Sequence, residues 1–129
     1  MRVEAEVNPT ENQEKVKKAI TNIVSNPTFK TASEGYKTIL VARAEGREAL
    51  STFYNLLRKE MILDTARSVL FKGIDGNCIR FYLNKQVAFV KKISFCKPFA
   101  ESPLGPLKVE IICDGPEDFI NWLSPKTSR

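Results

Sequence analysis

The sequence predicts an α+β fold: a single sheet of four or five strands, with helices covering one face. Segments in which apolar and polar residues alternate are interspersed with segments in which apolar residues recur at helical spacing. The chain has 129 residues, of which 43% are hydrophobic and 27% charged, as is typical of one soluble globular domain. No internal repeat or linker-like segment divides it, so we expect one domain over residues 1–129, with an ordered core from about residue 2 to residue 123.

The chain opens with a strand followed by a helix. Arg2–Val7 alternates between polar and apolar residues, which predicts a half-buried strand, and Asn8 and Pro9 end it. Thr10 and Gln13 have the spacing of a capping box, which predicts that a helix begins at Thr10. The apolar stripe of this helix consists of Val16, Ala19, Ile20 and Ile23.

The next part of the chain predicts a loop, a strand and two helices. Ser25–Tyr36 contains several turn-forming residues and is expected to be a loop, and Lys37–Ala44 is expected to be a strand. A helix follows from Gly46, because the apolar residues after it recur at helical spacing. A further helix is expected over Leu63–Phe71, with Gly73 as its stop.

The remaining segments complete the sheet. Asn77–Leu83 alternates like a strand, and Asn84 is expected to cap one or two helical turns that end at Val90. After these we expect a short strand at Lys92–Cys96 and a proline-stiffened loop at Lys97–Pro106. A strand at Leu107–Cys113 and a helix that begins at Pro116 follow. The tail Ser124–Arg129 is expected to fray, and the predicted order is β-α-β-α-α-β-(α)-β-β-α.

Residue types that the sequence lacks count against catalysis. Histidine is absent, which removes Ser-His-Asp and Cys-His nucleophile systems and His-ligated zinc sites. There is no glycine-rich phosphate loop, and Cys78, Cys96 and Cys113 lie far apart with no CxxC pair. We therefore expect no enzyme activity, no metal, no cofactor and no small-molecule substrate.

The sequence also predicts where the protein resides. The N-terminal residues lack the apolar core of a signal peptide, and the longest apolar runs have about four residues, far fewer than a membrane span needs. An odd number of cysteines without a signal peptide is typical of a reducing compartment. We expect a cytoplasmic protein with no membrane partner.

Basic residues concentrate in the middle of the chain. The protein has 20 Lys+Arg against 15 Asp+Glu, and residues 46–100 alone hold 10 basic and 4 acidic side chains. Solvated helix faces explain such an excess without any partner, whereas RNA binding needs cations at phosphate spacing and exposed aromatic rings for stacking. The candidate RNA-binding residues are Arg67, Lys72, Arg80, Tyr82, Lys85, Lys91, Lys92 and Lys97.

The outer face of the predicted sheet is the second part of this hypothesis. Alternation places charged and polar side chains on it, and the expected set is Arg2, Glu4, Glu6, Arg80, Tyr82, Lys92, Lys108 and Glu110. The alternative is a protein-interaction or homodimerisation module without nucleic acid, in which the outer face or an edge strand pairs with a partner or a second copy. Its apolar contacts would come from Ile112 in a strand and from Phe99 and Leu104 in the proline-rich loop.

Four segments of the sequence resemble a known family. They are Val3–Glu11, Phe71–Gly73, Asn84–Gln86 and Glu101–Pro106. Together they look like an archaeal family of small uncharacterised proteins, and the resemblance extends over roughly residues 2–123. The family is described as predicted RNA-binding, with a fold similar to large-subunit ribosomal protein five and loosely to double-stranded-RNA-binding domains. The resemblance implies an archaeal cytoplasmic α+β protein that binds RNA, and it supplies no site residues.

Overall fold

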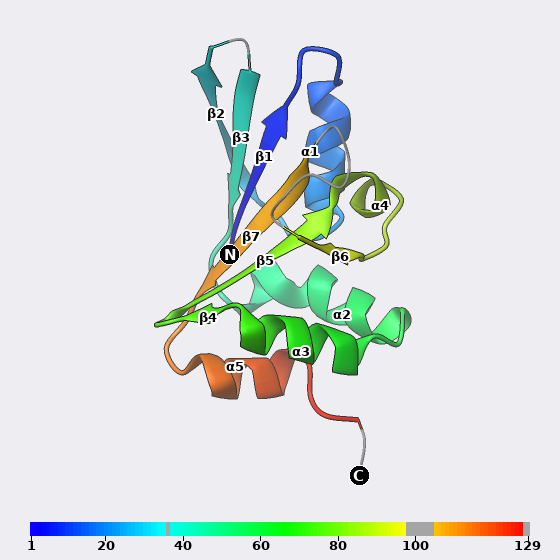
Figure 1. Cartoon of the computed structure of the whole chain (residues 1–129), viewed down its shortest axis with the longest axis vertical. Coiled ribbons are helices and arrows are strands. Elements are labelled where there is room, and N and C mark those ends of the chain that lie inside the picture. The colour runs from blue at the N-terminus through cyan, green and yellow to red at the C-terminus, as the bar shows by residue number, and fades with distance from the viewer. Residues whose placement is uncertain (36, 98–104, 128–129) are drawn as a thin grey trace.

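The residues that the structure describes form one antiparallel sheet, which has seven strands, with helices packed against it (Figure 1). The structure is a computed structural model and describes residues 1–35, 37–97 and 105–127. The strands lie in the order β2-β3-β1-β7-β5-β4, and β6 also pairs with β5. Their bounds are β1 (Arg2–Val7), β2 (Thr28–Glu34), β3 (Lys37–Arg43), β4 (Ile74–Asp75), β5 (Cys78–Asn84), β6 (Phe95–Cys96) and β7 (Pro106–Ile112).

The helices form two groups. α1 and α4 pack together near one end of the sheet, and α2, α3 and α5 pack together near the other (Figure 1). Their bounds are α1 (Gln13–Thr21), α2 (Ser51–Lys59), α3 (Leu63–Lys72), α4 (Lys85–Phe89) and α5 (Pro116–Leu123), and a 3-10 turn, η1 (Arg47–Leu50), precedes α2. Both groups contribute buried apolar side chains to one core cluster with the strands.

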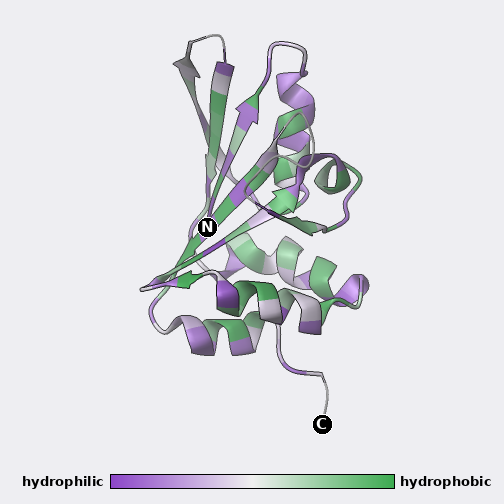
Figure 2. Ribbon diagram, viewed as in Figure 1, coloured by the Kyte–Doolittle hydropathy of each residue, from purple (hydrophilic) through white to green (hydrophobic). Residues whose placement is uncertain are grey.

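The core follows from the alternation along the central strands β5 and β7. The inward residues of these two strands face each other in register, as the pairs Ile79–Ile111, Phe81–Val109 and Leu83–Leu107. All six are at most 2% exposed, whereas the residues between them are half-buried. Figure 2 shows the corresponding alternation of hydrophobic and hydrophilic residues along β7. Phe53 of α2 stacks on Phe81 with ring centroids 5.6 Å apart, which joins the helical layer to the sheet. The α+β class predicted from the sequence is confirmed.

The predicted number of strands is wrong, because the sheet has seven strands instead of four or five. The largest error is β2, which pairs with β3 along its whole length in the segment Ser25–Tyr36 that was expected to be a loop. Thr28–Glu34 is polar and borders only one strand, so it lacks the apolar alternation by which a buried strand is recognised. β4 was also missed, since it has only two residues. Lys92 lies outside the sheet, because β6 begins only at Phe95.

The helix caps decide how α1 and α4 begin. The side chain of Asn12 caps α1 by accepting a hydrogen bond from the backbone N–H of Glu14 at 2.9 Å, so the helix begins at Gln13 instead of at the predicted Thr10. The prediction for α4 is confirmed, since Asn84 Oδ1 accepts from the backbone N–H of Val87 at 3.0 Å.

The chain is held against α3 beyond the end of α5. Ser124 is fully buried, and its hydroxyl donates to the backbone carbonyl of Leu63. Arg58 Nη1 donates to the carbonyl of Leu123 at 3.1 Å, which satisfies an acceptor at the C-terminus of α5. The backbone N–H and the hydroxyl of Thr127 both donate to Asp64. The segment expected to fray therefore makes defined contacts as far as Thr127.

Gly73 allows the end of α3 to lie directly against β5. The N–H of Arg80 donates to the carbonyl of Gly73 at 2.9 Å, and a Cβ added to Gly73 would lie 2.0 Å from the carbonyl oxygen of Arg80. Only a residue without a side chain fits there, because the atom in the way belongs to the backbone.

We predict that Gly73→Ala lowers the free energy of unfolding by about 2 kcal/mol or more, because β5 must move away from α3 to admit the methyl group. Urea unfolding measures the change. Ser68→Ala at an exposed position of the same helix is the control and should alter stability by less than about 0.5 kcal/mol. Equal stability of the two variants would contradict this account of the contact between α3 and β5.

Candidate nucleic-acid interface

The outer face of the sheet carries charged side chains in register across four strands. Successive partners across β3, β1, β7 and β5 form one row, namely Arg43, Arg2, Glu110 and Arg80. The next row, across β1, β7 and β5, is Glu4, Lys108 and Tyr82. Arg80 and Tyr82 therefore lie on the outer face, as the alternation predicts.

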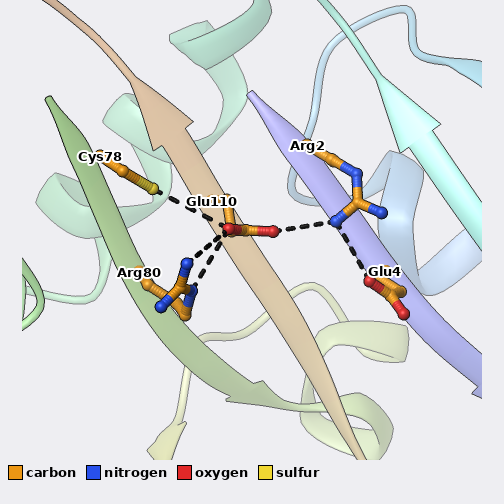
Figure 3. A network of polar contacts seen from close by, with 5 residues as sticks. All are labelled: Arg2, Glu4, Cys78, Arg80 and Glu110. Atoms are coloured by element: carbon orange, nitrogen blue, oxygen red, sulfur yellow. Dashed lines mark hydrogen bonds and ion pairs between the residues drawn. The ribbon is translucent and has the colours of Figure 1, made fainter. Parts of the chain in front are cut away.

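Most of these charges are paired with one another (Figure 3). Glu110 accepts from Arg2 Nη1 at 2.9 Å through Oε1, and from Arg80 Nη2 at 3.0 Å and Nε at 3.2 Å through Oε2. Arg2 also pairs with Glu4 at 3.1 Å, and Lys37 pairs with Glu6 at 3.4 Å. An RNA phosphate would have to compete with these carboxylates for the same cations, so much of the positive charge of this face is already compensated.

Glu110 stays ionised within this network. Partial burial alone would raise the pKa of the Glu110 carboxyl, but the hydrogen bond from Arg80 and the charges of Lys108, Arg80 and Arg2 outweigh it, so its pKa lies below the ordinary value. Burial, followed by the charge of Glu110, raises the pKa of the neighbouring Cys78 thiol. A thiol held in its protonated form is a poor nucleophile.

Lys85 is buried instead of being available to a phosphate. Its side chain is 5% exposed and forms an ion pair with Glu11, at 3.0 Å to Oε1 and 3.2 Å to Oε2. Its Nζ also donates to the backbone carbonyl of Glu6 at 2.8 Å. The sequence pattern does not predict this burial, because a lysine at the start of a short amphipathic helix normally points into solvent. Two of the family segments, Val3–Glu11 and Asn84–Gln86, thus meet at a structural contact.

Arg67 and Lys72 lie on α3, in the helix group away from α1 and α4. The Arg67 guanidinium lies over the ring of Phe71, 4.8 Å from its centroid, and Nη1 donates to the carbonyl of Ser124 at 3.4 Å. These contacts hold the C-terminal segment on α3. Lys72 is exposed at the end of the same helix. The structure therefore does not bring these two residues together with the cations that follow α4.

The cations after α4 lie beside lysines of α1 that the sequence did not single out. Asn22 Nδ2 donates to the backbone carbonyls of Ala88 and Phe89 at 3.0 and 3.1 Å, which fixes α4 on α1. Lys18 Nζ lies 5.5 Å from the centroid of the Phe89 ring. We define the lysine surface as four exposed side chains, two from α1 and two that directly follow α4: Lys15, Lys18, Lys91 and Lys92.

Lys91 occupies a position that favours glycine. Its N–H donates to the carbonyl of Ala88, and the N–H of Lys92 donates to that of Val87, which is the Schellman pattern at the end of a helix. Lys91 has φ of 62° there. A lysine in this left-handed conformation costs about 1 kcal/mol relative to a relaxed backbone. Lys97, which follows β6, is also exposed, and the preceding Cys96 pairs with Tyr82.

A cavity of about 380 Å³ opens between α1 and α4 next to the lysine surface. Its wall includes Val16 and Ala19 of α1 and Phe89 of α4, and the Glu11–Lys85 ion pair also lines it. Lys15 lies at the same cavity, so one member of the lysine surface borders an apolar hollow.

The protein-interaction hypothesis requires exposed apolar side chains. Ile112 is 78% exposed at the end of β7, as the protein-interaction hypothesis requires, whereas Phe99 and Leu104 lie outside the described residues. Within residues 1–35, 37–97 and 105–127, no group of three or more acidic or cysteine side chains is arranged to hold a metal ion. No helix in the described ranges has the length and apolar character needed to cross a bilayer.

Comparison with known proteins supports the resemblance seen in the sequence. A family model described as RNA binding matches residues 1–100. A UPF0201 protein of Sulfurisphaera tokodaii is 46% identical over 127 residues, covering 98% of this chain and 88% of the relative. The crystal structure of a UPF0201 protein from Methanococcus jannaschii superposes with a TM-score of 0.86 at 33% identity, covering 98% of this chain and 93% of that one. A DUF54 protein from Methanothermobacter thermautotrophicus has a TM-score of 0.63 at 19% identity over 95% of each chain, which shows a shared fold.

We predict that Glu11→Gln lowers the free energy of unfolding by about 3 kcal/mol, because it leaves the ammonium group of Lys85 buried without a counter-charge. Urea unfolding measures the loss. Glu14→Gln is the matched control, since Glu14 is exposed and pairs with Lys17 at 3.7 Å on the same helix. Removing that exposed pair should cost less than about 0.5 kcal/mol. An equally small loss for Glu11→Gln would contradict the buried pair.

Proposed function

Since the chain belongs to the UPF0201 family of archaeal proteins and to the RNA-binding family whose model spans residues 1–100, we propose that it is a non-catalytic RNA-binding module that contacts phosphates through the lysine surface. Of the candidate cations derived from the sequence, Lys91 and Lys92 remain at the centre of this proposal. Lys15 and Lys18 join them from α1, outside the segment 46–100 to which the sequence analysis assigned the site.

The observation that carries the proposal is the contrast between two positively charged surfaces. Arg2, Arg80 and Lys37 on the sheet each pair with a carboxylate within 3.4 Å. No described residue forms an ion pair with any of the four side chains of the lysine surface, which are all exposed. A cation that is not paired with a carboxylate can contact a phosphate and release counterions from the RNA without breaking an ion pair within the protein. Such cations therefore contribute most to the affinity for RNA.

The acidic residues near α1 are engaged elsewhere. Glu11 is committed to Lys85 and to the backbone and side chain of Asn8. Glu14 forms its ion pair with Lys17, at 3.7 Å. The N-terminal segment, which is almost neutral by composition, therefore presents local positive charge at the junction of α1 with α4.

We predict that a variant with Lys15→Ala, Lys18→Ala, Lys91→Gly and Lys92→Ala binds single-stranded RNA at least about tenfold more weakly than the wild type at moderate salt. The slope of log K against log salt should become shallower by about 3, because each lost phosphate contact removes about 0.7. Fluorescence anisotropy of a labelled oligonucleotide at several salt concentrations measures both quantities.

The matched control removes the same number of charges from exposed lysines elsewhere, by Lys30→Ala, Lys59→Ala, Lys72→Ala and Lys126→Ala. This variant should keep most of the affinity and of the salt dependence. If the two variants lose equal affinity, binding depends on net charge alone and the proposed surface is wrong. If neither the wild type nor the control binds RNA at low salt, RNA binding itself is rejected.

We also predict that Lys91→Gly alone weakens RNA binding while changing the free energy of unfolding by less than about 1 kcal/mol, because glycine relieves the left-handed backbone but adds freedom to the unfolded chain. Anisotropy and urea unfolding measure the two effects. Met61→Gly is the control, since Met61 has φ of 57° at the same position of a Schellman motif after α2 and is 88% exposed. Met61→Gly should leave RNA affinity unchanged, and a loss of affinity equal to that of Lys91→Gly would contradict a role for the Lys91 charge.

A further inference from the structure

The two edges of the sheet differ in how they are protected against pairing with another chain. Beyond β5 the sheet ends in β4 and β6, which have only two residues each. Very short edge strands are one of the ways in which natural sheets avoid edge-to-edge pairing. The other edge is β2, which has seven residues and is the outermost strand in Figure 1. Only the edge at β2 is therefore long enough to template a further strand.

β2 has few of the features that protect a long edge strand. Its register with β3 is unbroken from Thr28 to Glu34, so no bulge twists the edge away. The strand contains no proline, and Lys30 is the one charged residue of Thr28–Ser33. Among the strands that the structure describes, β2 pairs with β3 alone. Every second residue of β2 consequently directs its N–H and C=O groups away from the sheet.

The side chains of β2 leave this edge accessible. Phe29 is half-buried, and Lys17 of α1 lies over its ring with Nζ 5.7 Å from the centroid. The other side chains up to residue 33 are all exposed, namely Thr28, Lys30, Thr31, Ala32 and Ser33. A partner strand can approach the edge without opening the core.

A second copy of this chain is the partner that protects the edge completely. A single added strand, such as that of a peptide, would itself become the new long edge of the sheet. When β2 pairs with β2 of a second copy, the joint sheet ends on both sides in two-residue strands. Antiparallel pairing of a strand with its own copy follows a twofold axis, so the assembly closes at two chains.

The residues of β2 suit this pairing when the twofold axis passes through Thr31. All seven residues of the strand then have a partner, and Thr31 lies opposite its own copy. Lys30 of each copy lies opposite Ala32 of the other, on the outer face of the sheet that Val41 and Glu4 share. No two lysines are directly opposed in this register, whereas an axis through Lys30 would oppose them and be destabilising.

We propose that two copies of this protein join edge to edge through antiparallel pairing of β2 with β2, which continues the sheet from one copy into the other. The inference goes beyond RNA binding, since no residue of the lysine surface belongs to β2. One strand of seven residues supplies far fewer contacts than the about 20 to 30 residues per side of a standard interface. The dimer is therefore weak and depends on concentration.

Sedimentation velocity without RNA tests the proposal. Between about 10 μM and about 1 mM, the mass of the wild type should rise from that of one chain toward that of two. Ala32→Glu places a carboxylate opposite Lys30 of the other copy, twice in each dimer, and should lower the dissociation constant about fivefold. Ala32→Lys opposes like charges at the same two places and should raise it about fivefold. Both substitutions lie at an exposed position.

The matched controls are Ser68→Glu and Ser68→Lys, because Ser68 is exposed on α3 and the net charge changes by the same amounts. Both should leave the dissociation constant within about twofold of that of the wild type, since distant surface charges are screened at moderate salt. A wild type that stays monomeric over the whole concentration range overturns the proposal. Shifts of both Ala32 variants in the same direction overturn it as well, and so do shifts no larger than those of the Ser68 variants.

Amide hydrogen exchange supplies a second measurement on the unaltered protein. The amides of β2 that point away from β3 should exchange more slowly at the higher of the two concentrations, because pairing protects them. The amides of β4 should exchange equally at both concentrations. Equal exchange of the β2 amides, in samples whose mass has doubled, would show that the dimer forms through another surface and would overturn the pairing.

Discussion

The buried ion pair between Lys85 and Glu11 is the interaction on which the candidate site depends. It joins two parts of the chain that are distant in the sequence, because Lys85 at the start of α4 pairs with Glu11 just before α1 and also donates to the carbonyl of Glu6 in β1. Two charged groups that are removed from water stabilise a fold only when each is fully paired. Here hydrogen bonds to backbone groups complete the pairing of both side chains. The pair therefore helps to fix where α1 lies relative to α4, and with it the position of the lysines of α1 relative to those that follow α4.

The distribution of charge follows from which acids are already engaged. On the outer face of the sheet, Glu110 lies between Arg2 and Arg80, so strand register itself brings opposite charges together. At the junction of α1 and α4, Glu11 is committed to Lys85, and no described residue forms an ion pair with the exposed lysines. The exposed lysines at this junction come from two distant parts of the sequence, residues 15–18 and 91–92, so no single segment shows them together.

Much of the fold could be predicted from the sequence, because alternation and helical spacing report directly on one buried face. The strands β1, β5 and β7 and the helix α3 lie close to where the pattern places them. β2 escaped prediction because an edge strand with polar residues on both faces has no such pattern. The central strands suffice to predict the α+β class. Predicting the number of strands also requires the edge strands, whose sequences show the weakest alternation.

The candidate site was harder to predict, since it depends on contacts between segments. Lys85 and Lys91 look equivalent in the sequence, yet one is buried against Glu11 and the other is exposed in a left-handed turn. The sequence does not single out Lys15 and Lys18, because residues 1–45 contain almost as many acidic as basic residues. One of these acids, Glu11, is in the buried ion pair and not on the surface. Ion pairs between distant segments, and not the composition of any one segment, determine which cations remain available to RNA.

Lysine footprinting by chemical acetylation and mass spectrometry can show which lysines contact RNA, because it reports on every lysine of the unaltered protein in one experiment. We expect RNA to protect Lys15, Lys18, Lys91 and Lys92 from acetylation, and we expect Lys85 to react little with or without RNA because it is buried. Protection of Lys30, Lys37 and Lys108 on the sheet, with the lysine surface still reactive, would show that RNA binds the outer face of the sheet and not the lysine surface.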